Sequence, residues 1–309
     1  MDDKIIHEKQ DLTHLTWSRY RHTSGTAGSF LKAYSDLDGT KKYYKMSNYE
    51  ALNGVVGHES VNEIIVDRLL TTLGIDHVPY RLINADIVVD GARISTYICV
   101  SEDFKRPGER KVAFDIYYQQ CKKANETPIE FCHRMGWTDI INSMLMTDFL
   151  ILNRDRHGAN IEVLKGSGKS VRLAPLYDHG LSLMFSCHTD SEMEAFDIMA
   201  DLPVQSFIGG RSAYENLKLI SGSQSGSRVL LSDDNDKSVS KTRSGNLIQQ
   251  SGLDNESVSG TWTSRPLQES DRDVILFDLE GVLPDAWLDK IWKMIWERWR
   301  VYEDLQNYR

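Results

Sequence analysis

The sequence has few cysteines, and none of them is grouped with another. The four cysteines among 309 residues form neither a CxxC pair nor a cysteine–histidine cluster with the spacing of a zinc site. The chain also has no run of 18 apolar residues, and its N-terminus, MDDKIIHEKQDLTH, is acidic and polar where a secretory signal is basic and then apolar. We therefore expect a cytoplasmic protein with reduced thiols that neither crosses nor binds a membrane.

The sequence also has fewer basic residues than acidic ones. The 36 Lys and Arg residues are outnumbered by 45 Asp and Glu residues, which gives a net charge of -9. Because a protein that wraps DNA or RNA needs a basic face, this balance argues against strong direct nucleic-acid binding. No repeat with a period of twenty to fifty residues occurs, so solenoids and propellers are excluded. The 40% of hydrophobic residues are enough for the packed core of a globular protein, and 309 residues are enough for two lobes or two small domains.

Apolar residues are scarce in one segment, 221–272. It contains 13 serines and 5 glycines among its 52 positions, and 10 of its residues are hydrophobic. Such a segment cannot bury enough apolar surface to offset the entropy that ordering costs. We therefore interpret 221–272 as a flexible insertion.

The first hundred residues have the pattern of strands with a single helix. SFLKAY and KKYYKMS alternate and are joined by a turn at Asp38-Gly39, which predicts a hairpin. From Ser60 the apolar residues recur with helical spacing, so a helix is expected with Ser60 as its cap and Gly74 at its end. The following segment, 80–100, returns to strand character with a turn at Asp90-Gly91. This third of the chain should form a small sheet with one helix.

The rest of the chain is mainly helical in pattern. A helix is expected over 138–153, directly before a polar loop, and a closing amphipathic helix lies in LPDAWLDKIWKMIWERWRVYEDL. The apolar stripe of that closing helix consists of Leu288, Ile291, Trp292, Ile295, Trp299 and Tyr302.

Two acids and an amide suitable for phosphoryl transfer follow the helix over 138–153. In protein kinases the catalytic aspartate precedes a metal-binding asparagine by five positions, and a D-x-G acid follows downstream. Asp155 and Asn160 have this spacing, and Asp178 begins the sequence Asp-His-Gly. Asp155 would therefore orient the acceptor hydroxyl, while Asn160 and Asp178 would hold magnesium.

Upstream residues fit the same scheme. HTSGTAGSF places Gly25, Thr26, Gly28 and Ser29 between strand-like segments, where backbone amides could approach the phosphates of ATP. The strand that ends near Glu102 would be the last before the second lobe, and its backbone could contact the adenine edge.

Lys45 is the candidate for the phosphate-binding lysine, with Glu63 on the next helix as its partner. Glu59 lies one turn earlier on the same face and is the alternative to Glu63. The alternatives to Lys45 are Lys32, Lys41 and Lys42.

A family resemblance rests on the catalytic loop. The pattern DxxxxNxDRHxxN resembles the signature of phosphatidylinositol 3/4-kinase-like enzymes and of HipA-like serine/threonine kinases, and RLAPLYDHG is similar to the HipA-like metal-binding segment. The similarity covers about 23–178 and extends to the order of the strand with Lys45 and the helix with Glu63. Four residues of the pattern are interpreted as structural support for the loop: Asp148, Asn153, Arg156 and His157.

The resemblance implies an α+β, bilobal protein-kinase-like fold in the short stand-alone form of this family. A β-rich N-lobe would span 1–100, and a helical C-lobe would span 101–220 and 273–309, with the insertion between its two parts. It also implies ATP and Mg²⁺ as cofactors, a protein with Ser or Thr acceptors as substrate, autophosphorylation, and room for a regulatory protein partner.

Other functions are open at this stage. The same site could phosphorylate a lipid or a small molecule, or the chain could be a pseudokinase scaffold, although none of the expected metal ligands is missing. The segment KGSGKS, 165–170, resembles a P-loop but has Val163 where the first glycine is required. We interpret it as a hairpin turn.

Overall fold

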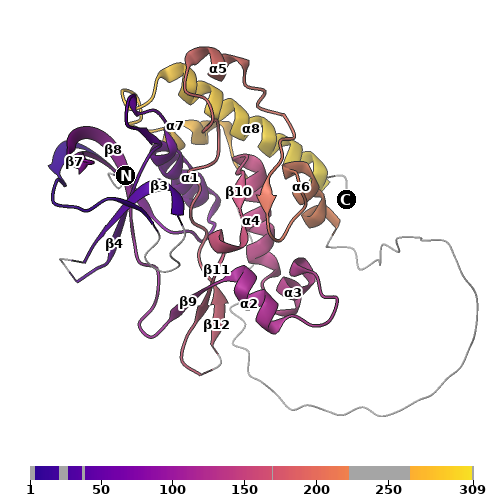
Figure 1. Cartoon of the computed structure of the whole chain (residues 1–309). Coiled ribbons are helices and arrows are strands. Elements are labelled where there is room, and N and C mark those ends of the chain that lie inside the picture. Colours follow the sequence, from indigo (N-terminus) through magenta and orange to yellow (C-terminus); the bar gives the residue numbers. More distant parts are fainter. Residues whose placement is uncertain (1–3, 21–26, 37–38, 169, 223–264, 308–309) are drawn as a thin grey trace, which may run out of the picture.

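A six-stranded sheet forms the first part of the protein. The computed structural model describes residues 4–20, 27–36, 39–168, 170–222 and 265–307 (Figure 1). The sheet has the order β1-β7-β8-β4-β3-β2, in which β1 runs parallel to β7 and the other neighbours are antiparallel. Its strands are β1 (Ile5–Asp11), β2 (Ser18–Tyr20), β3 (Ala27–Ser35), β4 (Lys42–Met46), β7 (Tyr80–Val89) and β8 (Ala92–Glu102).

Both hairpins predicted for this sheet are confirmed. β3 and β4 pair so that Lys32 lies opposite Lys45. Between β7 and β8, Asp90 and Gly91 have φ values of 51° and 81°, the left-handed conformation that a tight hairpin turn requires. A short hairpin of β5 (Tyr49–Glu50) and β6 (Gly54–Val55) follows β4.

Helix α1 (Glu59–Leu73) packs against the sheet, as predicted. It ends at Gly74, whose φ of 70° closes the helix in the left-handed conformation. The predicted cap was wrong. His58 is the N-cap residue and makes no side-chain capping bond, while the Ser60 hydroxyl donates to the Lys45 carbonyl at 3.1 Å. Ser60 therefore attaches the helix to strand β4 instead of capping it.

The second part of the chain is mainly helical and includes two small sheets. β9, β11 and β12 form an antiparallel sheet, and β10 pairs with β13 in parallel. Helix α4 lies in the middle of this part and contacts α3, α6 and α8 (Figure 1). The elements are β9 (Arg110–Ala113), α2 (Phe114–Cys121), α3 (Pro128–Arg134), α4 (Thr138–Leu150), β10 (Asp155–Arg156), η1 (Gly158–Asn160), β11 (Glu162–Lys165), β12 (Val171–Leu173), α5 (Asp190–Ala195), β13 (Gln205–Ser206), α6 (Ala213–Gly222), η2 (Glu269–Asp271), α7 (Arg272–Ile275) and α8 (Asp285–Asn307).

The closing helix and the turn at 165–170 follow the predictions. All six residues of the predicted apolar stripe of α8 are buried. KGSGKS connects the antiparallel strands β11 and β12, so it forms a hairpin turn. Within the described segments, no helix is both long enough and apolar enough to span a membrane.

The end of the predicted insertion needs correction. The sequence analysis assigned 265–272 to the flexible insertion, but Leu267 is 3% exposed and belongs to the main core, and η2 follows it. The prediction missed this attachment because it rested on the average composition of the segment, in which a single buried leucine has little weight. Residues 223–264 lie outside the described part of the chain.

The hydrophobic core is continuous from the sheet into the helical part. One cluster includes α1, the inner face of β7 and β8, and α4, α6 and α8, while a second cluster covers the opposite face of the sheet. Helix α1 therefore shares a core with both parts of the protein. This position holds the helix next to the segment that follows β12.

Candidate active site

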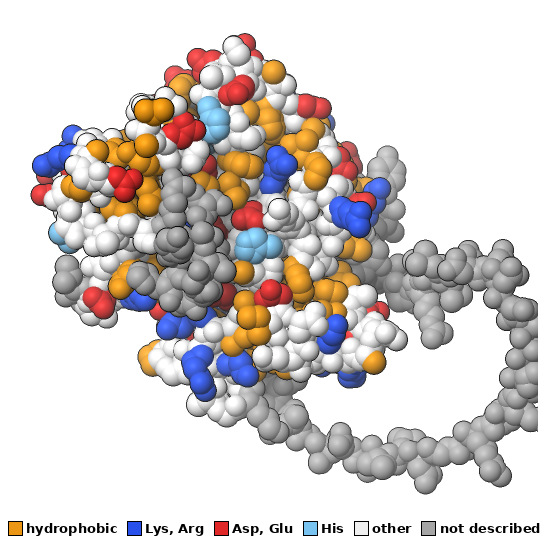
Figure 2. All heavy atoms as spheres, in the orientation of Figure 1, with side chains coloured by type: hydrophobic (Ala, Val, Ile, Leu, Met, Phe, Trp, Pro, Cys, Tyr) orange, Lys and Arg blue, Asp and Glu red, His pale blue; other side chains and the backbone are white. Residues whose placement is uncertain are grey.

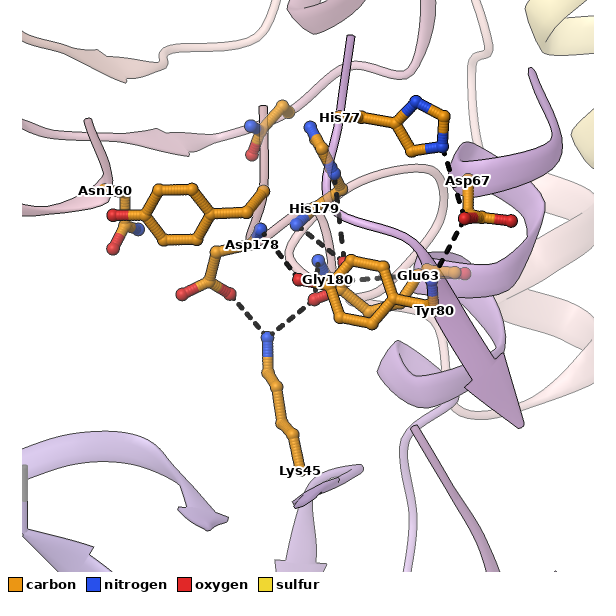
Figure 3. A network of polar contacts seen from close by, with 12 residues as sticks. Lys45, Glu63, Asp67, His77, Tyr80, Asn160, Asp178, His179 and Gly180 are labelled. Carbon is orange, nitrogen blue, oxygen red and sulfur yellow. Dashed lines mark hydrogen bonds and ion pairs between the residues drawn. The ribbon is translucent and has the colours of Figure 1, made fainter. Parts of the chain in front are cut away.

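Three charged side chains from distant parts of the chain meet at one point. Lys45 on β4 directs its Nζ atom toward Glu63 Oε1 at 2.9 Å and toward Asp178 Oδ1 at 2.5 Å (Figure 3). Glu63 comes from α1, and Asp178 follows β12. The structure thus brings together the lysine, the glutamate and the D-x-G aspartate that the sequence analysis selected.

Glu63, and not Glu59, is the partner of Lys45. The Glu63 carboxylate is buried and also accepts hydrogen bonds from the backbone N–H groups of His179 at 2.9 Å and Gly180 at 3.0 Å. Glu59 instead accepts from the backbone N–H of Asn48 at 2.9 Å, and burial raises its pKa. Glu63 therefore links the lysine to the D-x-G segment.

Lys45 keeps its charge despite its position. Burial alone would lower the pKa of Lys45, but the carboxylates of Asp178 and Glu63 raise it well above its ordinary value. The ammonium group is therefore a permanent cation at this point of the site. Such a fixed charge suits the binding of phosphate oxygens.

Asp178 has an unusual backbone conformation. Its φ of 59° lies in the left-handed region, which is uncommon for a residue with a side chain and is frequent at functional sites. Its N–H donates to the Tyr80 hydroxyl oxygen at 3.3 Å, and the backbone N–H of Tyr80 donates to Asp67 at 3.0 Å. These bonds hold the aspartate in place from the side of the sheet.

The glycine of the D-x-G segment is required by close packing. A Cβ atom on Gly180 would lie 2.9 Å from Lys45 Nζ and 3.3 Å from Glu63 Oε1. A side chain here would push the lysine away from its two carboxylates. On the far side of the segment, Asn62 donates to the carbonyls of Gly180 at 3.0 Å and Ser182 at 2.9 Å.

Asp155 and Asn160 lie together in the loop that follows α4. The Asn160 amide Nδ2 donates to the Asp155 carbonyl at 2.9 Å and to its carboxylate Oδ2 at 3.2 Å. Since the side-chain nitrogen of Asn160 faces Asp155, the side-chain oxygen Oδ1 of Asn160 points away from Asp155. His157 is partly exposed and places its Nε2 3.5 Å from Asp155 Oδ1.

The remaining motif residues support this loop. Asp148 accepts hydrogen bonds from Asn153 Nδ2 at 2.9 Å and from Arg156 at 2.9 and 3.0 Å. Arg156, which is 2% exposed, also donates to the carbonyls of Asn160 at 3.2 Å and Tyr177 at 2.8 Å. One buried guanidinium thus connects the end of α4, the loop that follows it and the segment before Asp178.

A cavity of about 260 Å³ lies beside these residues, slightly below the range of about 300–1,000 Å³ that is usual for small-molecule sites. At one end it contacts Lys32, Lys45, Asn160 and Asp178. Another part of the lining is rich in aromatic rings: Lys41 lies over Tyr34 and Tyr43, and Lys111 lies over Tyr43 and Phe104. Tyr177, Ser101, Glu102 and Glu162 also line the cavity. Such a division suits a ligand with a phosphate chain at one end and a flat base at the other.

Some predicted residues are placed elsewhere or are not described. Gly25 and Thr26 lie outside the described residues, and Gly28 and Ser29 fall within strand β3. Glu102 ends β8 and contacts the cavity, as expected for the strand before the second lobe.

The three lysines considered in place of Lys45 have different positions. Lys32 lies next to Lys45 at the same end of the cavity, and Lys41 lies over the rings of Tyr34 and Tyr43. Lys42 is on β4 opposite Glu102 and is not among the residues that line the cavity.

The donors present fit a magnesium-bound nucleotide. Mg²⁺ is usually held by one or two carboxylates together with substrate phosphates, so one carboxylate and one amide oxygen are an adequate protein contribution. Asp178 and Asn160 both line the cavity and provide these two donors. Among the described residues, no group of three or more His, Cys, Asp and Glu side chains forms a separate metal site.

Comparison with known proteins places this site in a known fold. No family model and no curated protein matches the sequence. Among solved structures, the proinflammatory kinase CtkA of Helicobacter pylori superimposes with a TM-score of 0.52 at 12% sequence identity, and 94% of each chain is covered. The chain therefore shares the fold of this kinase. The α+β, kinase-like fold expected from the sequence is thus confirmed.

A second solved structure is less similar. The match to the Shewanella oneidensis HipA, HipB and operator DNA complex covers 53% of this chain and 42% of the other, with a TM-score of 0.28 and 12% identity.

Proposed function

We propose that the protein is an ATP-dependent, HipA-like serine/threonine kinase that transfers the γ-phosphoryl group to hydroxyl groups of proteins. The observation that supports this most directly is the contact of Lys45 with both Glu63 and Asp178 at the phosphate end of the cavity. In protein kinases a lysine–glutamate ion pair and a D-x-G aspartate must both be in place for phosphoryl transfer.

Each residue of the site has a distinct role in this proposal. Lys45 binds phosphate oxygens and is oriented by Glu63. Asp178 and Asn160 are the residues that would hold magnesium, which supplies positive charge to the phosphates when bound. Asp155 orients the acceptor hydroxyl and accepts its proton, and the hydrogen bond from Asn160 fixes its carboxylate.

The acceptors and partners are part of the same proposal. Autophosphorylation is expected on Ser24, Thr26 and Ser29 and on the serines of 221–272. Ser24, Thr26 and 223–264 lie outside the described residues, whereas Ser29 falls within β3. A regulatory protein partner that alters this activity is also compatible with the proposal. Intact-mass measurement after incubation with ATP and magnesium detects autophosphorylation. Phosphosite mapping in a cell lysate identifies protein substrates.

The decisive experiment separates the two aspartates. Asp178→Asn should weaken magnesium-dependent ATP binding and abolish transfer, because it removes a charged metal ligand. Asp155→Asn keeps the shape of the side chain, so it should retain ATP–magnesium binding while kcat falls by about 10² to 10⁴. Calorimetry with ATP, with and without magnesium, and a phosphotransfer assay measure both effects.

Asp273→Asn is the matched control. The Asp273 side chain is 85% exposed on α7, so its substitution should change neither binding nor transfer. Full activity of Asp155→Asn, or an equal loss of ATP binding in both site variants, would show that the assigned roles are wrong.

A further inference from the structure

Two lysines lie side by side at the phosphate end of the cavity. Lys32 on β3 is directly opposite Lys45 on β4, and both contact the cavity. Like charges directly opposite each other on neighbouring strands repel, so this pair is unfavourable for the sheet itself. A bound anion at this point would turn the repulsion into a favourable interaction.

Asp178 contacts both lysines in the structure. Asp178 Oδ1 lies 2.5 Å from Lys45 Nζ, and Asp178 Oδ2 lies 3.8 Å from Lys32 Nζ. Lys45 also contacts Glu63, and its side chain is 10% exposed, whereas that of Lys32 is 36% exposed. A long and exposed ion pair contributes little, so the contact between Lys32 and Asp178 is the weaker of the two lysine contacts of Asp178.

The other two lysines of the cavity belong to its aromatic end. Lys41 lies over the rings of Tyr34 and Tyr43, and Lys111 lies 3.8 Å from the ring centre of Phe104. Lys111 is also ion-paired with Asp103 at 3.3 Å and with Glu162 at 3.7 Å. Lys32 is therefore the second lysine of the end that carries Asp178.

We propose that Lys32 is a second phosphate-binding residue, which contacts the outermost phosphate of a nucleoside triphosphate. This inference rests on the proposed kinase function. A metal ion at the Asp178 carboxylate would compete with both ammonium groups, and the contact of Asp178 with Lys32 is the longer of the two. Lys45 lies deeper and stays with Glu63, so it would contact the inner phosphates, while Lys32 at the mouth of the cavity reaches the outer one.

Nucleotides of different length test this assignment. Calorimetry with AMP, ADP and ATP, each with and without magnesium, should be carried out on wild type, Lys32→Met and Lys32→Arg. Lys32→Met should weaken ATP binding about tenfold, ADP binding less and AMP binding not at all, because it removes one charged hydrogen bond to the terminal phosphate. Lys32→Arg keeps a cation and should retain most of the ATP affinity.

Lys9→Met is the control for net charge. Lys9 lies on β1 of the same sheet, pairs with Asp86 and is 52% exposed, so this variant should bind all three nucleotides like wild type. ATP binding by Lys32→Met at wild-type affinity would overturn the inference, and so would an equal loss for AMP, ADP and ATP. If wild type binds none of the nucleotides, the proposed function itself is wrong, and the inference with it.

Discussion

At the scale of single residues, the charged groups of the site are paired with one another. Lys45 contacts Glu63 and Asp178, while Arg156 contacts Asp148. Removing one partner of a buried ion pair leaves an uncompensated charge and costs about 3–5 kcal/mol. Substitutions in these pairs should therefore lower stability as well as activity, so ligand binding has to be measured well below the unfolding transition of each variant.

His58 is a buried histidine outside the site. Its ring packs edge-on against Trp287 with ring centres 5.2 Å apart, and its Nε2 has no hydrogen-bond partner among the described residues. Burial, together with nearby His188, lowers the pKa of His58 to about 4. The ordinary pKa is about 6.5, so on acidification through this range the unfolded chain takes up a proton that the folded chain does not. The folded state should lose on the order of 3 kcal/mol between these two pH values.

We expect His58→Phe to remove this part of the acid sensitivity. The phenyl ring keeps the contact with Trp287 and does not titrate, so the variant should gain stability relative to wild type as the pH falls through that window. Above about pH 7 the difference should be constant. Urea unfolding at a series of pH values measures it. His133→Gln, at an exposed position on α3, is the control, and parallel pH profiles for wild type and His58→Phe would contradict the prediction.

The contacts within the loop after α4 could be predicted from the sequence because they are local. The hydrogen bonds from Asn153 to Asp148 and from Asn160 to Asp155 each join residues five positions apart. By contrast, Tyr80 contacts Asp178 across 98 positions. No spacing in a single sequence indicates such a pair, so the role of Tyr80 became visible with the fold.

At the scale of elements, α1 and the segment 178–182 form one unit. Glu63 accepts the backbone N–H groups of His179 and Gly180, and Asn62 donates to the carbonyls of Gly180 and Ser182. The helix therefore holds the segment 178–182 through both its N–H groups and its carbonyl groups. A displacement of α1 would move Asp178 away from Asn160.

Asn62→Ala tests this attachment. It removes the donor for two buried carbonyls and should lower the free energy of unfolding by about 2–4 kcal/mol. If Asn62 positions Asp178, magnesium-dependent ATP binding should also weaken by about tenfold, whereas magnesium-free binding should change less. Calorimetry and urea unfolding on the same preparation separate the two effects.

Leu217→Ala is the control for stability alone. Leu217 is fully buried on α6, so its truncation should cost about 2–5 kcal/mol of stability without changing ATP binding. The positioning role of Asn62 would be refuted by unchanged magnesium dependence in Asn62→Ala at a comparable loss of stability.

Elements with local signals were predicted, and those formed by distant segments were not. The β3–β4 and β7–β8 hairpins have turn residues between alternating strands, and α8 has a long apolar stripe. Strand β1 has no comparable signal, because it pairs in parallel with β7, about 75 positions later. Its first residue, Ile5, is buried, and the strand completes the edge of the sheet.

At the scale of the whole molecule, charge is unevenly distributed. Figure 2 shows acidic side chains around the helices at the top of the view and basic side chains at the bottom, where β9 and β12 lie. These strands contribute Arg110, Lys111 and Arg172, whereas α5 contributes Asp190, Glu192 and Glu194. The net charge shows that the protein as a whole is acidic, but the fold determines where acidic and basic side chains lie on the surface.

Whether the protein needs the serine-rich segment 223–264 to fold can be tested by deleting it. Both flanks of 223–264 belong to one core, because Ile220 on α6 and Leu267 before η2 are buried in the same cluster. We expect that replacing 223–264 with a linker of about twelve Gly and Ser residues, which spans up to about 40 Å, leaves the fold intact. Shortening a flexible loop changes its closure entropy by about 0.6 kcal/mol per twofold change in length, so Tm should shift by at most a few degrees.

A longer deletion provides the contrast. Extending the replacement to 223–271 also removes buried Leu267 and Asp271, whose carboxylate accepts the backbone N–H of Gln268 at 2.8 Å. Loss of a buried leucine alone costs about 2–5 kcal/mol, so this variant should unfold at a clearly lower temperature than the shorter deletion. Calorimetric unfolding of both variants measures the difference. An equally large decrease in unfolding temperature in both variants would show that 223–264 contributes to stability. A decrease confined to the longer deletion would show that the attachment at Leu267 makes this contribution.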